Sequence, residues 1–228
     1  MIQEAHQAYN AKEYNKALQL YTSLAQQGDA TAQTSLAFMY QQGQGCEVDE
    51  TKALTLYQEA AKEMQPYALF NLALLYANGI GGVEHDQFKA FELYLAAAER
   101  EVPPAMYETA LMLERGLGCI QNYSEAAFWY EEAAKRGHIQ AFNNLGVLYK
   151  DGLGVEQNDQ RAFICFVSAS EGGLAQGHYN LGLMYDQGLG CEQDNDKALD
   201  LCRKAAYAGH EKAKQIIKGL QEDGKIVF

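Results

Sequence analysis

The chain has 228 residues, of which 18 are basic and 30 are acidic, so its formal net charge is −12. A chain this acidic lacks the basic footprint that binds phosphate backbones or anionic lipid, so nucleic acid and membrane surfaces are excluded as expected partners. No apolar run reaches the roughly 18 residues that a membrane span needs, so we also expect no membrane insertion.

The N-terminal residues predict a capping helix pair over residues 1–29. Ala17, Tyr21, Leu24 and Ala25 recur at helical spacing, but no Gly-x-Gly loop separates the two helices. The first residues, MIQEAHQAYNAKEYNKA, have neither the basic start nor the apolar core of a signal peptide. We therefore expect a cytoplasmic protein, although a periplasmic or secreted protein trimmed of its signal peptide would look the same.

A block of 36 or 37 residues then recurs as five units between residues 30 and 210. Repeats of this length are typical of a solenoid, in which each unit stacks on copies of itself because it cannot bury its apolar face alone. The marker of every unit is a Gly-x-Gly loop. These loops are Gly43/Gly45, Gly79/Gly81, Gly116/Gly118, Gly152/Gly154 and Gly188/Gly190.

Each unit predicts two helices, and the fourth unit shows the pattern. Ala141 and Leu148 follow helical spacing, and Gly152 is placed to end this first helix in the left-handed conformation. Asn158 stands four residues before Ala162 and predicts the N-cap of the second helix. Its equivalents in the other units are Asp49, Asp86, Asn122 and Asp194.

The second helix of each unit ends on a shared position as well. Met64 and Glu101 replace the usual glycine there, and Pro66, Pro103 and Pro104 follow directly, so we expect these prolines to break the helix instead. In the three remaining units the residue is Gly137, Gly173 or Gly209, and the capping helix pair ends on Gly28.

Residues 211–228 predict a C-terminal capping helix and a short tail. Ala213 and Ile217 keep the repeat pattern, while Lys218 and Gln221 give the final helix the polar outer face that a solenoid needs for solubility. The chain is therefore predicted to be all-α, a single right-handed α-solenoid superhelix of antiparallel helix pairs over residues 1–228.

The five cysteines predict reduced thiols. Cys46, Cys119 and Cys191 follow the Gly-x-Gly loops of alternate units. Two helix spacings of roughly 8–10 Å exceed the roughly 7 Å Cα separation that a disulfide tolerates. Cys165 and Cys202 lie in neighbouring units and could approach each other, but they fit better as small apolar fillers.

No catalytic, cofactor-binding or metal-binding residues are expected. The histidines are repeats apart, and His138 and His210 take equivalent turn positions that favour a capping role. The glycine loops lack a preceding strand and a phosphate-binding lysine, so they do not predict a nucleotide site. We therefore expect a protein that is not an enzyme.

These residues resemble the SEL-one-like repeat (SLR) family, close relatives of the tetratricopeptide repeats. The resemblance rests on A-x-x-x-L-G/A-x-x-Y-x-x-G-x-G followed by D/N-x-x-x-A-x-x-x-Y/F-x-x-A-A-x-x-G, and it covers residues 30–210. The fifth unit reads GHYNLGLMYDQGLGCEQDNDKALDLCRKAAYAGH. The third unit departs from the pattern, with Thr109 and Leu113 in place of Leu and Tyr.

The resemblance implies that the first helix of each unit lines a concave face that binds partners. Ahead of each Gly-x-Gly loop lies a small marker residue, which is Ala32, Ala68, Ala105, Ala141 or Gly177. Two residues after this marker, aromatics are frequent on the presumed open side. This row is Thr34, Phe70, Tyr107, Asn143 and Tyr179. We expect this row to be more exposed than Phe38, Leu74, Leu111, Val147 and Leu183, which would form core or groove floor. Near the helix ends, polar residues flank the row at Asn78, Arg115, Lys150 and Asp186. An alternative is that the aromatics only pack on the neighbouring helix.

A polar row runs beside the aromatics at Ser35, Asn71, Glu108, Asn144 and Asn180. These side chains could bond a bound backbone, but we favour the interpretation that they tie neighbouring helices together, because buried polar groups usually satisfy each other. The Asn and Lys of a carboxylate clamp are absent, so no C-terminal carboxylate ligand is predicted.

The function expected from the resemblance is that of a non-catalytic scaffold or adaptor that binds a protein or peptide. We expect the protein to be acidic, bacterial and monomeric. An alternative is an immunity or inhibitor protein whose acidic surface matches a basic toxin or enzyme. A hydrolase embedded in the repeat is less favoured, since no catalytic constellation departs from the repeat pattern.

Overall fold

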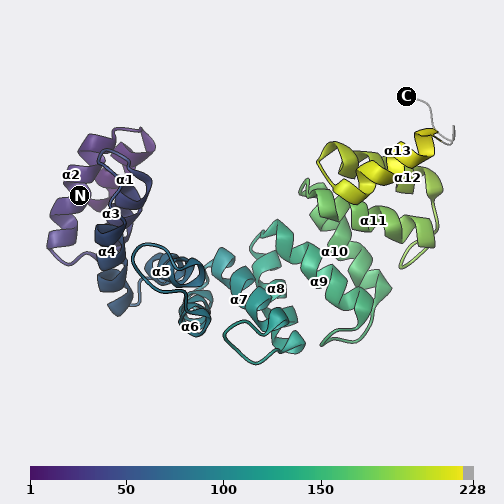
Figure 1. Cartoon of the computed structure of the whole chain (residues 1–228), viewed down its shortest axis with the longest axis horizontal. Coiled ribbons are helices and arrows are strands. Elements are labelled where there is room, and N and C mark those ends of the chain that lie inside the picture. Colours follow the sequence, from purple (N-terminus) through teal and green to yellow (C-terminus); the bar gives the residue numbers. More distant parts are fainter. Residues whose placement is uncertain (223–228) are drawn as a thin grey trace. The chain divides into compact units, whose positions relative to one another are not determined.

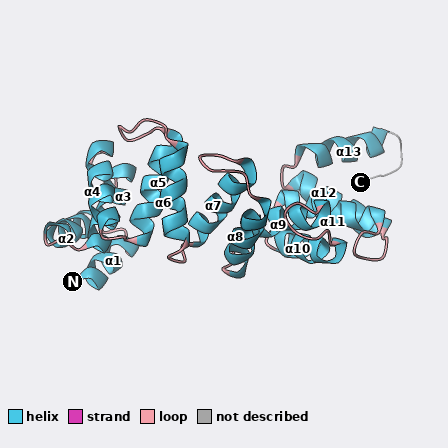
Figure 2. Ribbon diagram, turned by 90° about the horizontal axis from the view of Figure 1, so that it is seen from below, coloured by secondary structure: helices cyan, strands magenta, loops and turns pink. Residues whose placement is uncertain are grey.

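A computed structural model describes residues 1–222, which form thirteen helices and no strand (Figures 1 and 2). The all-α prediction is therefore confirmed for this part of the chain. The predicted tail at residues 226–228 lies outside the described residues. The chain divides into two compact units, which are described separately: unit 1 is Met1–Ile120 and unit 2 is Gln121–Phe228.

Unit 1 contains seven helices, each packed against the next along the chain. The core between them is built from alanines such as Ala32 and Ala68 and from larger side chains such as Tyr57, all without exposed surface. The helices are α1 (Ile2–Asn10), α2 (Tyr14–Gln26), α3 (Ala30–Gln42), α4 (Glu50–Lys62), α5 (Pro66–Asn78), α6 (Gln87–Ala98) and α7 (Pro103–Arg115).

Unit 2 continues the same pattern with six helices, again packed in chain order. Small residues bring them close: a Cβ added to Gly146 would lie 2.7 Å from the Phe166 ring, which is itself 1% exposed. The helices are α8 (Tyr123–Lys135), α9 (Ile139–Asp151), α10 (Asp159–Glu171), α11 (Ala175–Gln187), α12 (Asn195–Tyr207) and α13 (Glu211–Glu222). No helix within residues 1–222 is long and apolar enough to cross a membrane.

The predicted N-caps of the second helices are confirmed in all five repeats. Asn158 Oδ1 accepts a hydrogen bond from the backbone N–H of Arg161 at 2.9 Å, which satisfies one of the unpaired donors at the start of α10. The same bond is made by Asp49, Asp86, Asn122 and Asp194. The residue type at this position therefore fixes where each second helix begins.

The two glycines of each loop have different roles, as the fourth repeat shows. Gly152 ends α9 with φ +67°, the left-handed conformation that the sequence predicts. Gly154 is required for space as well, because an added Cβ would lie 2.3 Å from the backbone carbon of Tyr123 at the start of α8. Ser124 Oγ then donates to the Gly154 carbonyl at 2.7 Å, so the loop is held on the preceding second helix.

The prolines do not act where the sequence analysis places them. Pro66 and Pro103 occupy the first turns of α5 and α7, where a missing backbone N–H costs nothing. The preceding turns are made by Met64 (φ 56°) and Glu101 (φ 63°), which adopt the left-handed conformation in place of glycine. The expectation that the prolines end the second helices is therefore wrong: they begin the next helix.

Candidate functional site

The first helices of the repeats are α3, α5 and α7 in unit 1 and α9 and α11 in unit 2. The surface that these helices present within each unit is called the inner face of that unit below. The aromatics predicted there are half-buried and contact other rings. Phe70 lies against Tyr94 with ring centroids 5.8 Å apart. Tyr179 stacks on His210 at 4.2 Å and 21°. Tyr107 is also half-buried, on α7. The aromatics thus combine packing with partial exposure.

The expected order of exposure between the two rows is reversed at several positions. Thr34 and Asn143, which the sequence places on the open surface, are each 7% exposed. Phe38 is 37% exposed and Leu183 is 36% exposed, although they were expected to form core or groove floor. The equivalent residues Leu74, Leu111 and Val147 are half-buried, so exposure at this repeat position differs from one repeat to the next.

The amides of unit 2 bind each other. Asn180 Nδ2 donates to Asn143 Oδ1 at 2.8 Å, and Asn143 Nδ2 donates to Asn144 Oδ1 at 3.2 Å. Asn144 Nδ2 in turn donates to the hydroxyl of Tyr130 at 3.0 Å, so the chain of bonds joins α11, α9 and α8. This supports the interpretation that the polar row ties neighbouring helices together.

The polar residues predicted at the helix ends are not equivalent. Asn78 is exposed and donates to the Leu74 carbonyl of its own helix at 2.8 Å. Lys150 pairs with Asp151 at 3.2 Å. Arg115 is exposed, and its charge acts on the carboxyl of Glu108. Asp186 is exposed and forms no ion pair with another described residue.

Glu108 is the one acid of the polar row, and its environment differs from that of the amides. Burial raises the pKa of its carboxyl, while the nearby charge of Arg115 lowers it. The charge of Glu108 also adds to burial in raising the pKa of Tyr94 on α6. The inner face of unit 1 therefore carries a carboxyl, that of Glu108, whose charged form is destabilised by burial in the folded protein.

Unit 2 has an apolar groove that begins on the inner face at α11 and extends onto α12 and α13. Its volume is about 340 Å³, and helices α11, α12 and α13 line it. The principal side chains are Leu183, Asp186, Leu199, Cys202, Ile216 and Leu220. Tyr179 closes one part of it through its stack on His210, whose Nδ1 accepts the Ala213 N–H at 3.2 Å and so caps α13.

Unit 1 has a smaller groove of about 270 Å³, lined by α1, α2, α3 and Asn71 of α5. Phe38 is its apolar member, but its other lining groups are largely polar and already bonded. Tyr9 donates to Gln44 Oε1 at 2.8 Å, and a hydrogen bond joins Tyr21 to Ser35. Of these two grooves, that of unit 2 is lined by more apolar side chains.

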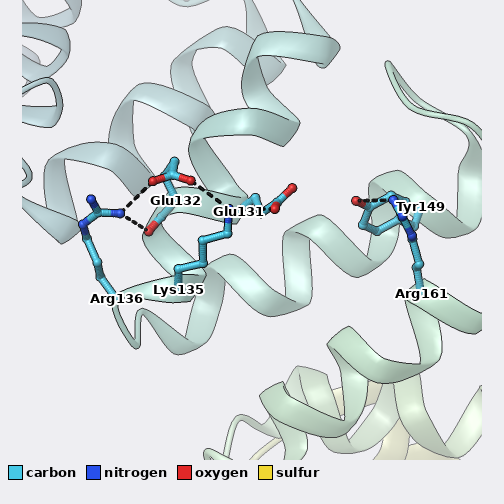
Figure 3. A network of polar contacts seen from close by, with 6 residues as sticks. All are labelled: Glu131, Glu132, Lys135, Arg136, Tyr149 and Arg161. Atoms are coloured by element: carbon cyan, nitrogen blue, oxygen red, sulfur yellow. Dashed lines mark hydrogen bonds and ion pairs between the residues drawn. The ribbon is translucent and has the colours of Figure 1, made fainter.

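A cation placed over a tyrosine ring recurs between the two helices of a repeat. Arg161 lies 5.4 Å from the Tyr149 ring centre and donates to its hydroxyl at 3.3 Å (Figure 3). The same pair is made by Lys52 over Tyr40, Lys89 over Tyr76 and Lys197 over Tyr185. In the third repeat both members are replaced, by Leu113 and Glu125. The pair therefore belongs to the repeat's framework.

Charged side chains on α8 also bind one another. Glu132 accepts from Lys135 at 2.9 Å and from Arg136 at 2.8 Å (Figure 3), and these bonds hold the pKa of its carboxyl below the usual value. Lys135 also pairs with Glu131 at 2.8 Å.

The five cysteines are free thiols, and the described residues contain no group of three or more His, Cys, Asp or Glu placed to hold a metal ion.

The Sel1 repeat model matches this chain at six segments, residues 11–29, 30–63, 66–102, 103–138, 140–174 and 175–210. The chain belongs to the Sel1 repeat family. Proteins of this family generally act as non-catalytic scaffolds for protein–protein interaction. The first match lies within the helix pair that the sequence analysis treats as an N-terminal cap, so that pair is itself partly a Sel1 repeat.

Two solved structures share the Sel1 repeat arrangement over nearly the whole chain. A Sel1 repeat protein from Oxalobacter formigenes is 28% identical, with a TM-score of 0.88 over 95% of this chain and 86% of its own. A protective antigen present in uropathogenic Escherichia coli strains, which displays an SLR fold, is 29% identical. Its TM-score is 0.84, over 92% of this chain and 45% of the antigen.

A curated relative matches over a shorter stretch. Chitin synthase regulatory factor 3 of Schizosaccharomyces pombe is 32% identical over 71 residues, which are 31% of this chain and 8% of that protein. The chain thus spans a small part of this relative's length.

The part of the candidate groove that the sequence did not predict lies on α13. Ile216 and Leu220 line the unit 2 groove, whereas the sequence analysis treats this helix only as a cap with a polar outer face. Their spacing of four residues, beside the buried Ile217, is the signal that could have revealed a second apolar stripe.

Proposed function

We propose that this Sel1 repeat protein is a non-catalytic adaptor that holds a protein or peptide partner on its inner face. The observation that carries the proposal is the apolar groove of unit 2, where two lining residues, Leu183 and Ile216, keep 36% and 41% of their surfaces exposed. Clustered apolar surface of this kind marks interaction sites more often than scattered single residues do. Family membership supports the same function.

The acidic composition favours a partner with basic residues. A net charge of −12 attracts positively charged surfaces and speeds their encounter with the chain. The inhibitor role considered from the sequence is a narrower form of this proposal, in which the basic partner is an enzyme or toxin that loses its activity when bound.

The experiment is an affinity capture with the tagged full chain, followed by mass spectrometry and by reconstitution with each purified candidate. We expect at least one protein to bind the purified chain directly, in a complex that weakens as salt is raised. If the purified candidates fail to bind, or if the captured material is nucleic acid, the adaptor proposal is wrong. Loss of the partner's own activity on binding would select the inhibitor role.

A further inference from the structure

The unit 2 groove has the size of a site for a peptide segment. Its volume of about 340 Å³ lies near the lower end of the roughly 300–1,000 Å³ that is usual for ligand clefts. Small residues create the depth, because Gly182 and Ala198 at its floor are both buried and carry little or no side chain. The groove therefore accommodates a few side chains of one segment.

Helix α13 presents more apolar surface than capping requires. Ala213 and Ile217 are 0% and 7% exposed and complete the packing of α13 in unit 2. Ile216 and Leu220 instead line the groove opposite Leu183, and Ile216 stays 41% exposed. A helix that served only to end the array would carry polar residues at these two positions. The second apolar stripe thus indicates an occupant.

One edge of the groove is negatively charged. Asp186 lines this edge, and its carboxylate forms no ion pair among residues 1–222. Residues 192–197 form the end of the preceding loop and the first turn of α12. Glu192 and Asp196 are exposed in this segment, and they too lack a cation partner within the described residues. The nearest basic residue in that segment, Lys197, already pairs with Asp194 at 3.0 Å. A cation brought by an occupant would therefore be attracted here.

We infer that this groove docks an apolar segment of a partner protein that carries Lys or Arg at one end. Its apolar side chains pack on Leu183, Leu199 and Ile216, and its cation pairs with Asp186. The inference rests on the proposed adaptor function and adds the position of the site and the chemistry of the segment. Electrostatic complementarity sets the direction in which the segment lies.

The test uses random peptides displayed on phage and selected on the full chain. We expect enriched sequences that combine apolar residues with Lys or Arg. Leu183→Glu and Ile216→Glu should weaken binding of a selected peptide at least about tenfold, because each places a charge in the apolar contact. Asp186→Lys should weaken it roughly two- to fivefold, as expected for an exposed ion pair.

Matched controls come from outside the groove. Phe38 occupies the repeat position equivalent to Leu183 and is 37% exposed against 36%, but it lies in the unit 1 groove, so Phe38→Glu should leave peptide affinity unchanged. Ile164→Glu changes an exposed residue of unit 2 that does not line the groove. Circular dichroism of every variant separates lost binding from lost folding.

Several results would overturn the inference. Selection without enrichment, peptides that bind Leu183→Glu and Ile216→Glu as well as the wild type, or peptides without basic residues would each contradict it. A large rise in affinity after removal of residues 223–228 would make that segment of the chain the occupant. A dimer that Leu183→Glu dissociates in analytical ultracentrifugation would make it a second copy. The adaptor function stands in all these cases if the captured partner still binds the groove variants.

Discussion

Helix α7 of unit 1 and helix α9 of unit 2 hold equivalent positions in successive Sel1 repeats, and both place polar side chains on buried parts of their surfaces. In α9, the buried Asn143 exchanges hydrogen bonds with Asn180 and Asn144. In α7, Thr109 is fully buried where α9 has Leu145, and its Oγ1 has no hydrogen-bond partner among residues 1–222. Glu108 adds a carboxyl whose pKa burial raises.

The difference separates two properties of a repeat. The repeated glycines, alanines and caps determine which positions are buried, and they do so in both units. The individual side chain then determines whether a buried polar group finds a partner, which is costly when it does not. The buried polar residues of α9 should therefore stabilise the protein, whereas the unpaired hydroxyl of Thr109 on α7 should destabilise it.

The largest effect is expected from importing the α7 residue into α9. Leu145 is 5% exposed, so Leu145→Thr removes buried apolar volume and adds a hydroxyl in an apolar setting. We expect a loss of about 3 kcal/mol in the free energy of unfolding, measured by urea denaturation. A loss below that of an exposed control, Ile164→Thr, would show that position 145 tolerates polar groups and would break the comparison.

A second prediction concerns the amides of unit 2. Asn143→Ala removes the acceptor of Asn180 Nδ2 and the donor to Asn144 Oδ1, both on half-buried side chains, so the free energy of unfolding should fall by about 2 kcal/mol. Asn78→Ala is the control, because Asn78 is exposed and bonds only its own helix. Equal stability of the two variants, together with lost partner affinity for Asn143→Ala, would make Asn143 a ligand-binding residue instead.

The reciprocal change in unit 1 should stabilise the protein. Thr109→Val keeps the shape of the side chain but removes the unpaired hydroxyl, so we expect a gain of about 1 kcal/mol, visible as a raised urea midpoint. Thr55→Val, at an exposed position where the hydroxyl bonds the Thr51 carbonyl, serves as the control. Destabilisation by Thr109→Val would mean that the hydroxyl of Thr109 is satisfied in solution.

The smallest effect is the pH dependence set by Glu108. Because folding raises its pKa, the stability that this group contributes is fully present below its unfolded value of about 4.3 and is lost as pH rises through the folded pKa. Glu108→Gln should therefore gain stability relative to the wild type as pH is raised from acid toward neutral. Unfolding free energies of both proteins across this range measure it. A difference that stays flat across this range would contradict the assignment.

The parts of the fold that follow from local rules were predictable from sequence. Gly152 and Asn158 act through their own backbone and the adjacent turn, so the residue type suffices to place the ends of α9 and α10. The role of Pro66 was misassigned because a proline is compatible with both the end of one helix and the start of the next. Met64 decided between them by adopting a positive φ itself.

The groove was only partly predictable, because it depends on contacts between helices. Tyr179 and Asp186 were placed on the inner face from their repeat positions, and both line the unit 2 groove. The contributions of Ile216 and Leu220 could not be predicted without the position of α13, whose second apolar face lines the groove together with α11. The tyrosine–cation pairs need similar knowledge, since Tyr149 and Arg161 are twelve positions apart in sequence.

Hydrogen–deuterium exchange of the full chain, with and without a captured partner or selected peptide, tests the central claim most directly. The account predicts that bound partner slows amide exchange in α11, α12 and α13, that α3 around Phe38 is unaffected, and that Leu183→Glu abolishes the slowing. Slowed exchange confined to other helices, or slowing of α11 to α13 that persists in Leu183→Glu, would contradict a groove in unit 2 as the binding site.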